Sequence, residues 1–402
     1  MAGGTRSYEF ARRLVNEGHE VHIITSDCAN DRFAGWRVTH EAGIIVHWLS
    51  APYSNHMTYP ERIKAFLFFS FKAAKKAASL PADLILATST PLTIAIPAVH
   101  AARRQRIPLV FEVRDLWPEL PIAMGALPRL VIPFARWLER FAYQNSAHIV
   151  ALSPGMREGI LKQCIPSERV HVIPNSADVE LFDVPPELGR SFRRQHGWLQ
   201  NRPLVVYAGT LGRINGVIYL VELAAQAAQI DPEICFLIVG DGYDQSLIRQ
   251  RADELQVLNK NLFMMESIPK REMAAVLSAA TIATSVFIDL PEMWNNSANK
   301  FFDALAAGKP IAINYKGWQA ELLEETGAGL VLPAKDPTMA AHTLLEFLHN
   351  PRKLEQAGQA ARNLAYHRFH RDLNARQLMN VLRLALGQDD NCPDRAYRAT
   401  AK

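Results

Sequence analysis

Short apolar runs alternate with helical patterns in the first half of the chain. Runs rich in Val, Ile and Leu are typical of buried strands, and they lie at residues 20–26, 44–50, 83–89, 108–113 and 147–153. Continuous runs of this kind indicate parallel strands covered by helices on both faces. Residues 5–18 carry an apolar helical stripe, and residues 153–163 begin with Ser153-Pro154, an N-cap and first-turn pair. The pattern predicts an α/β domain over residues 1–180.

A looser stretch, residues 178–203, has adjacent prolines and several charges, and we interpret it as the connection between two domains. Strand-like runs then resume at residues 204–209, 235–242, 261–266, 283–288, 310–315 and 329–333. They predict a second Rossmann-like domain over residues 200–365. Two such parallel-sheet domains create a cleft between the carboxyl ends of their strands, where ligands bind. A last helix is expected at 366–387, followed by a disordered polar tail, 388–402.

Composition and charge narrow the class of protein. The 402 residues are 49% hydrophobic and 21% charged, with a net charge of +4, as in ordinary soluble proteins. No apolar run reaches the roughly 18 residues that a membrane span needs. The four cysteines are scattered without metal or disulfide spacing, which favours a reducing cytoplasm. The mild charge argues against nucleic acid as a partner but allows a local basic face toward a membrane or a phosphate.

Two glycine-rich turns follow strands of the second domain. The first, YAGTLGRING, contains Gly209, Thr210 and Gly212, with Arg213 directly after them. Backbone N–H groups in such a turn can approach an anion, and a guanidinium can bind a diphosphate through two hydrogen bonds. The next strand ends in a second turn, IVGDGYD. The alternative for both is a plain turn between a strand and a helix, with a capping Asp in the second.

The segment SANKFFDALAAGKP predicts a helix that begins at an N-cap, Ser297, and ends at a glycine and a proline. Lys300 and Asp303 are three residues apart, so they share one side of its first turns. The ammonium suits a phosphate, and the carboxylate suits a ribose diol. The alternative is a surface ion pair between these two side chains, which would contribute little to stability.

The first domain has its own cluster of charges, in FEVRDLWPE. A buried strand delivers Arg114, Asp115, Trp117 and Glu119 to its carboxyl end in quick succession. A purely structural loop has little use for this density of charges beside a tryptophan. We therefore interpret the segment as part of a functional site, because ligands bind at this edge of a parallel sheet.

A basic helical pattern at residues 61–81 suggests contact with a membrane. Lys64, Lys72, Lys75 and Lys76 share one broad face, and phenylalanines surround the rest. This distribution suits a helix that lies in the membrane interface. The alternative is a helix packed on its own sheet, with a solvated basic face.

Taken in order, these motifs resemble one known family. A glycine pair near the start is followed by GHEVHIITS, RDLWPE, ALSPGM, VIPNSAD, GTLG, LIVGDG and DALAAGKP. The series is similar to the retaining, sugar-nucleotide-dependent glycosyltransferases of family 4, which have the GT-B fold of two Rossmann-like domains facing a cleft. The resemblance is greatest to the WbuB-type bacterial amino-sugar transferases of O-antigen and capsule assembly, and it covers nearly the whole chain.

The resemblance implies a UDP-sugar as donor substrate, no cofactor and no metal, a polyprenyl-linked saccharide as acceptor, and peripheral contact with the inner face of the bacterial plasma membrane. It also implies that the last helix crosses back to the first domain. The catalytic residues would be Asp115, Arg213 and Lys300. The donor-binding residues would be Gly3, Gly4, Gly209, Thr210, Gly212, Gly240, Gly242, Ser297, Asn299 and Asp303. The acceptor-side residues would be Arg114, Trp117 and Glu119.

The chain departs from the family pattern in its charged positions. Members carry an Arg and a Lys in the first glycine turn, whereas this chain has Thr210 and Asn215, and Arg213 and Lys300 are the available substitutes. Members also carry two Glu separated by seven residues; here the first is Asn295 and the second is a shortened carboxylate, Asp. A second class of function therefore stays open, a non-catalytic GT-B-like protein that binds a sugar nucleotide or supports a partner enzyme. An epimerase of the same fold is a third.

The beginning of the chain also departs from the family. Members have a strand and a short loop before the glycine pair, which lies near the donor phosphates. No such strand precedes Gly3 and Gly4, so we expect a mis-assigned or truncated start and a first sheet that lacks its first strand. The strands beside that gap should be residues 20–26 and either 83–89 or 108–113, with backbone groups left unpaired.

Overall fold

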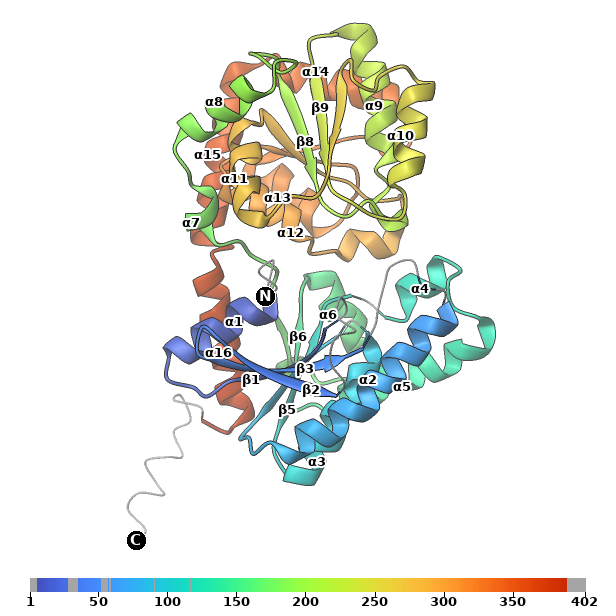
Figure 1. Ribbon diagram of the computed structural model, residues 1–402, viewed down its shortest axis with the longest axis vertical. Helices are drawn as coiled ribbons and strands as arrows, with labels where there is room; N and C mark the ends of the chain where they lie inside the picture. Colours follow the sequence, from blue (N-terminus) through green and yellow to red (C-terminus); the bar gives the residue numbers. More distant parts are fainter. Residues whose placement is uncertain are drawn as a thin grey trace.

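The computed structural model describes residues 6–27, 35–51, 57, 59–89, 91–115 and 117–388. Figure 1 shows two α/β domains stacked along the long axis of the molecule, with the chain crossing between them twice on the same side. Strands and helices alternate in both domains, and most neighbouring strands are parallel. The expected pair of Rossmann-like domains is therefore confirmed.

The first domain follows the predicted alternation with additions. Its helices are α1 (Arg6–Asn16), α2 (Tyr59–Ser79), α3 (Ala95–Gln105), α4 (Glu119–Ala123), α5 (Ile132–Gln144) and α6 (Pro154–Leu161), with short 3₁₀ turns η1 (Leu92–Ile94), η2 (Arg129–Val131) and η3 (Ser167–Arg169). Its strands are β1 (His22–Asp27), β2 (Trp36–Glu41), β3 (Ile44–Ser50), β4 (Ile85–Thr88), β5 (Leu109–Val113), β6 (His148–Ala151) and β7 (Val170–Val172).

These strands form two sheets, whereas the sequence predicts one parallel sheet. The orders are β1-β3-β2 and β4-β5-β6-β7, and β2 runs antiparallel to β3. The hydrophobic pattern misses β2 because its side chains are half-buried or exposed. Ala42 and Gly43 make the tight turn with φ of 50° and 79°. An ideal Cβ on Gly43 would lie 2.6 Å from Cγ1 of Val15, so the turn packs directly on α1.

The two sheets of the first domain are not joined to each other. β1 ends one sheet and β4 ends the other, and within the described ranges no strand pairs with the free edge of either. Both belong to the strands expected beside the missing first strand. Gly3 and Gly4 lie outside the described residues, so the expectation for them stays untested.

The second domain begins within the predicted connection, which contains two helices. Its helices are α7 (Val179–Phe182), α8 (Pro186–Gln195), α9 (Ile218–Ile230), α10 (Gln245–Glu254), α11 (Lys270–Ala279), α12 (Asn299–Ala306), α13 (Trp318–Thr326), α14 (Pro337–Leu348) and α15 (Pro351–His367), with the turns η4 (Arg213–Asn215) and η5 (Pro291–Asn295). Its strands are β8 (Leu204–Ala208), β9 (Cys235–Val239), β10 (Leu262–Met265), β11 (Ile282–Ser285), β12 (Ile311–Ile313) and β13 (Gly329–Val331).

The sheet of the second domain is parallel throughout, in the order β10-β9-β8-β11-β12-β13. Alternate side chains enter two separate cores, as a strand's period of two requires. Val206 and Leu237 pack with α11 and α12, and Val205 and Phe236 pack with α9 and α10. Because both faces are covered, the strands are continuously apolar, which is the pattern that reveals them in the sequence.

The end of the described chain differs from the single helix expected at 366–387. Two helices are present, α15 and then α16 (Arg371–Ala385), separated by a break at Arg368–His370. Ala375, Leu378 and Val381 of α16 are buried against the first domain, in a cluster with Phe10 of α1 and Val110 of β5. Figure 1 shows this last helix lying along the first domain.

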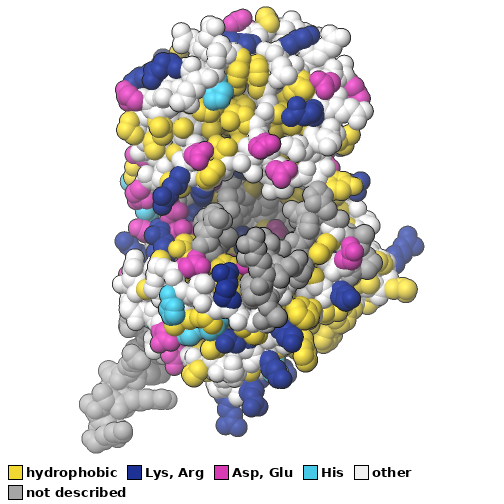
Figure 2. Space-filling model, in the orientation of Figure 1, with side chains coloured by type: hydrophobic (Ala, Val, Ile, Leu, Met, Phe, Trp, Pro, Cys, Tyr) yellow, Lys and Arg dark blue, Asp and Glu magenta, His cyan; other side chains and the backbone are white. Residues whose placement is uncertain are grey.

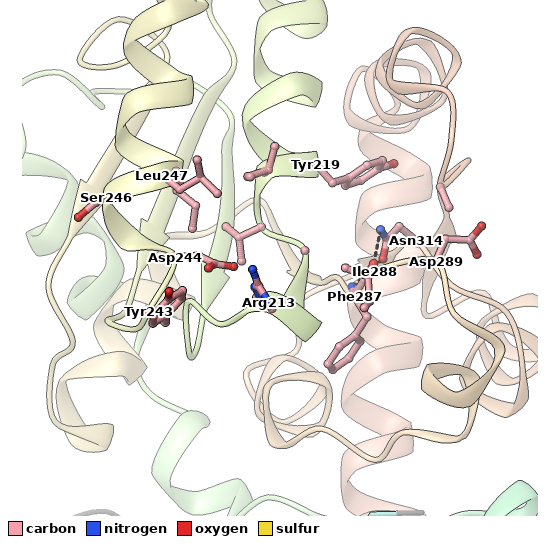
Figure 3. Close-up of a pocket in the computed structure, with 15 residues that line it drawn as sticks. Arg213, Tyr219, Tyr243, Asp244, Ser246, Leu247, Phe287, Ile288, Asp289 and Asn314 are labelled. Atoms are coloured by element: carbon pink, nitrogen blue, oxygen red, sulfur yellow. Dashed lines mark hydrogen bonds between the residues drawn. The ribbon is translucent and has the colours of Figure 1, made fainter. Parts of the chain in front are cut away.

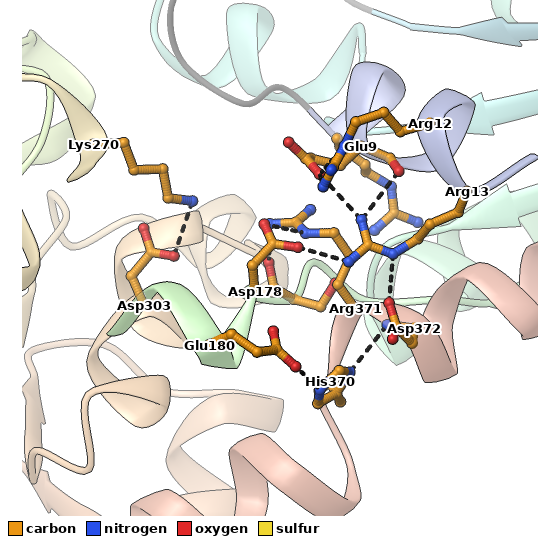
Figure 4. A network of polar contacts seen from close by, with 12 residues as sticks. Glu9, Arg12, Arg13, Asp178, Glu180, Lys270, Asp303, His370, Arg371 and Asp372 are labelled. Carbon is orange, nitrogen blue, oxygen red and sulfur yellow. Dashed lines mark hydrogen bonds and ion pairs between the residues drawn. The ribbon is translucent and has the colours of Figure 1, made fainter. Parts of the chain in front are cut away.

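Ion pairs hold the two crossings of the chain together (Figure 4). Asp178, in the first crossing, accepts hydrogen bonds from Arg13 of α1 at 2.8 Å and from Arg371 of α16 at 2.9 Å. Arg13 also donates to Asp372 at 2.5 Å, and the backbone N–H of Arg371 donates to the carbonyl of Ala177 at 3.2 Å. One cluster thus ties α1, the connection and α16 to one another.

Arg6 is buried at the base of the first crossing, with 1% of its surface exposed. Its guanidinium donates to Glu112 of β5 at 2.7 Å and to the carbonyls of Ile173 and Pro174 at 2.8 and 2.5 Å. Asn175 accepts a further bond at 3.2 Å. Arg6 is therefore a cross-link between the sheet of the first domain and the chain that leaves it.

Replacing Arg6 with Met should lower the free energy of unfolding by about 3–5 kcal/mol, because Glu112 would stay buried without its cation. Urea denaturation followed by circular dichroism measures this change. Arg12→Met is the matched control on the same helix: its side chain is 42% exposed and pairs with Glu9. The control should cost less than about 1 kcal/mol. Equal losses in both variants would contradict the cross-linking role of Arg6.

Candidate active site

The glycine turns lie at the carboxyl ends of β8 and β9 and touch each other. The N–H of Gly209 donates to the carbonyl of Val239 at 3.0 Å, and that of Leu211 donates to the carbonyl of Asp241 at 2.9 Å. An ideal Cβ on Gly240 would lie 1.9 Å from the carbonyl oxygen of Gly209. A residue with a side chain therefore cannot occupy position 240 unless the two turns separate.

Lys300, in the first turn of α12, points its ammonium at the end of β8. Nζ donates to the hydroxyl of Tyr207 at 3.0 Å and to Oδ1 of Asn215 at 2.9 Å, and it lies 4.5 and 4.6 Å from the ring centres of Tyr207 and Phe287. No carboxylate balances the charge in these contacts, and burial lowers the pKa of Lys300 to about 7. The family pattern has a lysine in the first glycine turn, at the position of Asn215 in this chain. Lys300, which comes from α12, thus places its ammonium beside that position.

Tyr207 holds this ammonium against the glycine turn. Its hydroxyl accepts from Lys300 and donates to the carbonyl of Thr210 at 2.8 Å. Burial raises the pKa of Tyr207, so the hydroxyl keeps its proton near neutral pH. A fixed chain of hydrogen bonds therefore connects Lys300 to the turn in which Thr210 replaces the family's arginine.

Asp303, one turn further along α12, faces a different partner from Lys300. Its Oδ1 lies 3.1 Å from Nζ of Lys270, the first residue of α11. Burial raises the pKa of Asp303, and the charge of Lys270 opposes that rise. The alternative of a surface pair between Lys300 and Asp303 is therefore wrong, because their contacts lie in separate places.

The expected N-cap of α12 is also wrong. The cap is Ala298, which makes no side-chain cap hydrogen bond. Oγ of Ser297 instead accepts from the N–H of Asn175, in the chain leaving the first domain, at 3.0 Å, and the Asn175 amide donates to the carbonyl of Ser297 at 2.5 Å. Ser297 thus joins the segment before α12 to the first crossing. Asn299, expected to contact the donor, is the first residue of α12.

A second contact joins the domains at Asn295, where the family has its first Glu. Oγ of Ser153 donates to the carbonyl of Asn295 at 2.7 Å and accepts from the N–H of Met156 at 3.1 Å, which confirms Ser153 as the N-cap of α6. An ideal Cβ on Gly155 would lie 1.8 Å from Oδ1 of Asn295. The N-terminus of α6 therefore packs tightly on η5, an interaction for which the sequence contains no evident signal.

Arg213 lines a cavity of about 580 Å³ at the N-terminal ends of α9 and α10 (Figure 3). The lining includes Arg213, Tyr219, Tyr243, Asp244, Phe287, Asp289 and Asn314. Burial raises the pKa of Asp244, and the positive charge of Arg213 opposes that rise. Lys300 does not line this cavity, so the structure separates the two cations that the sequence analysis assigns to one diphosphate. Phe287 belongs to both places, because its ring contacts Lys300 and also lines the cavity of Arg213.

On the first domain, the predicted acceptor-side residues lie at the end of β5 and beyond it. The N–H of Arg114 donates to Oγ of Ser89 at 3.0 Å, and Asp115 follows directly. Trp117 is half-buried and packs on the core of the first domain. Glu119 begins α4, where its carboxylate lies 3.7 Å from Arg136 of α5. The segment therefore leads from the sheet edge directly to the helices α4 and α5.

Neither a metal site nor a membrane span emerges in the part of the chain that the structure describes. In these residues no three His, Cys, Asp or Glu side chains are placed to bind one ion. No helix among them combines the length and apolar character that crossing a bilayer requires.

Comparison with known proteins identifies the family. Residues 2–176 match the glycosyl transferase 4-like domain, and residues 190–364 match the glycosyl transferases group 1. The two matches together cover most of the chain, which therefore belongs to these glycosyltransferases, enzymes that use nucleotide sugars. The predicted family and GT-B fold are confirmed at this level.

Individual relatives are distant in sequence and similar in fold. The α-D-kanosaminyltransferase of Streptomyces kanamyceticus is 24% identical over 282 residues, 69% of this chain and 70% of its own. Anabaena Alr3699/HepE in complex with UDP superposes with a TM-score of 0.67 at 18% identity, over 85% of this chain and 86% of its own. WaaG, a glycosyltransferase involved in lipopolysaccharide biosynthesis, superposes with a TM-score of 0.68 at 14% identity, over 94% and 95%.

Replacing Gly240 with Ala should lower the free energy of unfolding by about 1–3 kcal/mol, because a methyl group would force the two glycine turns apart. Gly197→Ala is the matched control, since an ideal Cβ there meets nothing within 4 Å. Urea denaturation of both variants tests the contact. A loss no larger than that of the control would show that the turns separate freely.

Proposed function

We propose that this protein is a retaining glycosyltransferase that moves a sugar from a UDP-sugar to a lipid-linked or saccharide acceptor in the synthesis of a bacterial surface polysaccharide. The observation that carries the proposal is the buried ammonium of Lys300 beside Asn215 and the first glycine turn. The name of the kanosaminyltransferase relative supports an amino sugar, N-acetylated in our proposal. The relative involved in lipopolysaccharide biosynthesis supports a lipid-linked acceptor.

The chemistry needs stabilisation of a leaving group. In the transfer, the bond from the anomeric carbon to the diphosphate oxygen breaks, and a bond from the same carbon to an acceptor hydroxyl forms on the same face. The acceptor proton passes to a phosphate oxygen of the departing UDP. Negative charge therefore grows on the diphosphate, and fixed donors that are already desolvated stabilise it most. Lys300, the N–H groups of Thr210 and Gly212 and the N-terminal end of α12 would supply those donors.

The other residues take roles around this centre. Asp303 would bind the ribose diol, exchanging part of its contact with Lys270 for two hydroxyl donors. Asp115 would orient the acceptor or the sugar from the opposite domain. Arg213 would act from the neighbouring cavity, in which it faces Asp244 rather than Lys300. The protein would work in the cytoplasm, on the inner face of the plasma membrane.

A non-catalytic sugar-nucleotide-binding protein is the second candidate, because Thr210 and Asn295 replace charged residues of the family pattern. The two functions differ in one measurement, the release of UDP from a UDP-sugar with and without a lipid-linked acceptor. Release that depends on the acceptor supports the transferase. Binding of UDP without any release would overturn that assignment and favour the second candidate.

The pH dependence of UDP binding should report on Lys300. Its ammonium is present in the free protein below about pH 7 and lost above it, and the diphosphate favours the ammonium form. Affinity should therefore fall as the pH rises above 7, by up to about tenfold per unit, because binding then takes up a proton. Lys300→Arg keeps its charge and should remove this dependence. Isothermal titration calorimetry at several pH values measures the UDP affinity of the wild type and of Lys300→Arg. The same pH dependence in both proteins would contradict the assignment of Lys300 to the diphosphate.

Loss of the Lys300 ammonium should lower the turnover rate more than it weakens donor binding. The reason is that the diphosphate gains negative charge only as the transition state forms. Lys300→Met should therefore lower kcat by a larger factor than it raises KM for the donor. Steady-state kinetics of UDP release tests this. A variant with a raised KM and an unchanged kcat would show that the ammonium only holds the substrate.

Asp303→Ala should weaken UDP binding by about 1–3 kcal/mol, the cost of leaving a buried ribose hydroxyl without its acceptor. Asp231→Ala is the matched control, since Asp231 follows the C-terminal end of α9, outside the Arg213 cavity, and pairs with exposed His349. The control should bind UDP like the wild type. If Asp303→Ala does so as well, the carboxylate does not contact the ribose.

A further inference from the structure

Lys270 begins a helix at the same edge of the sheet as the glycine turns. It follows the carboxyl end of β10 and is the first residue of α11. A positive charge in the first turn of a helix opposes the helix dipole, which favours acids at this end. The side chain is 22% exposed, and its ammonium lies 3.1 Å from Oδ1 of Asp303 in α12. The position of Lys270 therefore serves its contact with Asp303 rather than its own helix.

A buried aromatic ring also holds this ammonium. Nζ of Lys270 lies 5.4 Å from the ring centre of Phe182, which belongs to α7 and has 2% of its surface exposed. An ammonium over an aromatic ring is attracted by the electrons of the ring. The helix α7 packs on both α11 and α12, so the ring is fixed relative to both partners of the ion pair. Within the described residues, Lys270 makes no ion pair except that with Asp303.

The two carboxylate oxygens of Asp303 have different surroundings. Oδ1 is buried and faces Lys270, which supplies its ion pair. Oδ2 has no hydrogen-bond donor within reach in the part of the chain that the structure describes. An ionised carboxylate can accept several hydrogen bonds, so Oδ2 is the oxygen that is available to a ligand.

Two further charged groups act on Asp303, and they bind each other. Arg371 of α16 and Asp178 of the first crossing are both close enough to influence its ionisation, in opposite directions. Arg371 donates to Asp178 at 2.9 Å (Figure 4), so its charge is largely engaged there. Figure 2 shows acidic and basic side chains gathered at the waist of the molecule, on the side where the chain crosses between the domains. Lys270 is therefore the cation whose charge is directed at Asp303.

The other elements that pack on α12 leave this assignment unchanged. The strands β11 and β12 contain no charged residue. Glu180 of α7 pairs with His370, and Arg362 of α15 pairs with Asp183. Neither pair includes Asp303, so the contact with Lys270 decides how readily this carboxylate takes up a proton.

We propose that Lys270 is a positioning residue for the donor, which keeps Asp303 ionised and leaves its Oδ2 free to accept from the ribose hydroxyls. This role rests on the proposed function, in which Asp303 binds the ribose diol. A carboxylate meets the two hydroxyls as an acceptor, whereas a protonated carboxyl group would meet them with a donor of its own. Burial raises the pKa of Asp303, and the charge of Lys270 opposes that rise. Without Lys270, a larger fraction of Asp303 would therefore carry a proton at a given pH.

A purely structural ion pair is the alternative for Lys270 and Asp303. A pair of that kind contributes little net stability, because the cost of desolvating both charges offsets their attraction. Its loss would weaken the binding of every nucleotide by the same factor. A positioning role instead affects the discrimination between UDP and 2′-deoxy-UDP, which lacks one of the two ribose hydroxyls. Both nucleotides carry the same base and diphosphate, so any effect of Lys300 cancels in the ratio of their affinities.

Calorimetric titration of the full chain with UDP and with 2′-deoxy-UDP, from about pH 5 to 8, tests the proposal. The wild type should bind UDP about tenfold more tightly than the deoxy nucleotide, because the deoxy nucleotide leaves a buried acceptor without its donor. In Lys270→Met, this ratio should fall toward one at low pH, where Asp303 is protonated, and should recover as the pH rises and the carboxylate forms.

Three variants accompany this measurement. Lys270→Arg keeps the charge and should keep the wild-type ratio. Asp303→Ala removes the acceptor and should bring the ratio close to one at every pH. Lys260→Met is the matched control, because it removes the same charge from an exposed lysine that precedes β10, at the opposite end of that strand. Its ratio should equal that of the wild type.

Several results would overturn the proposal. One is a Lys270→Met protein with the wild-type ratio at every pH, and another is a ratio that falls by one constant factor across the range, as a structural pair predicts. A wild type that binds both nucleotides equally would refute the contact between Asp303 and the ribose, and the role of Lys270 with it. Failure of the transferase is a separate result, seen as release of UDP that does not depend on the acceptor, and it leaves the ratio of affinities intact.

Discussion

The placement of the two domains relative to each other depends on one cluster of ion pairs, at the point where the chain crosses between them. Asp178 accepts hydrogen bonds from Arg13 and Arg371, so a helix of the first domain, the outgoing connection and the returning helix share one carboxylate. Arg6 fixes the carbonyls just before it. Because a buried charge is costly without its partners, these groups specify one arrangement. The same arrangement keeps Ser153 of α6 against Asn295, and Asn175 against Ser297, just before the helix that carries Lys300.

At the candidate site, the proposed chemistry rests on residues that differ from the family pattern. The glycine turn of this chain has Asn215 in place of a lysine, and Lys300 of α12 places its ammonium beside that residue at the end of β8. The rings of Tyr207 and Phe287 and the hydroxyl of Tyr207 surround the ammonium, where a carboxylate would otherwise balance its charge. Such surroundings lower the pKa of Lys300 to about 7 and leave its ammonium without a competing anion. In the proposed function, an incoming diphosphate would therefore meet a cation that is already desolvated.

The sequence was sufficient for the parts of the fold that depend on repeated local pattern. Continuous apolar strands such as β8 and β9 could be predicted because both of their faces are buried. The sequence also pointed to Lys300 as a cation near Asn215, because the family pattern has a lysine at that position, and the structure places the two side chains in contact. The strand β2 has no such signal, since its side chains are half-buried or exposed.

Interactions between distant segments could not be predicted from the pattern. Arg6 looks like any polar residue at the start of a helix, and only the tertiary fold brings it to Glu112, 106 positions away. Ser297 has the right identity for a helix cap, yet Asn175 of the crossing occupies its hydroxyl. Arg213 and Lys300 likewise face different surroundings because of the path of the backbone through η4, which contains Arg213. The spacing of residues along the sequence does not specify that path.

The position of α16 has a consequence for the order in which the protein matures during synthesis. Phe10, Val110 and Val150 need Ala375, Leu378 and Val381 to complete their cluster, and these residues leave the ribosome more than 200 positions after β6. The second domain has all of its strands by residue 331. Although domains usually fold in the order of translation, the first domain here can complete its core only once α16 has been made, after every described strand of the second domain.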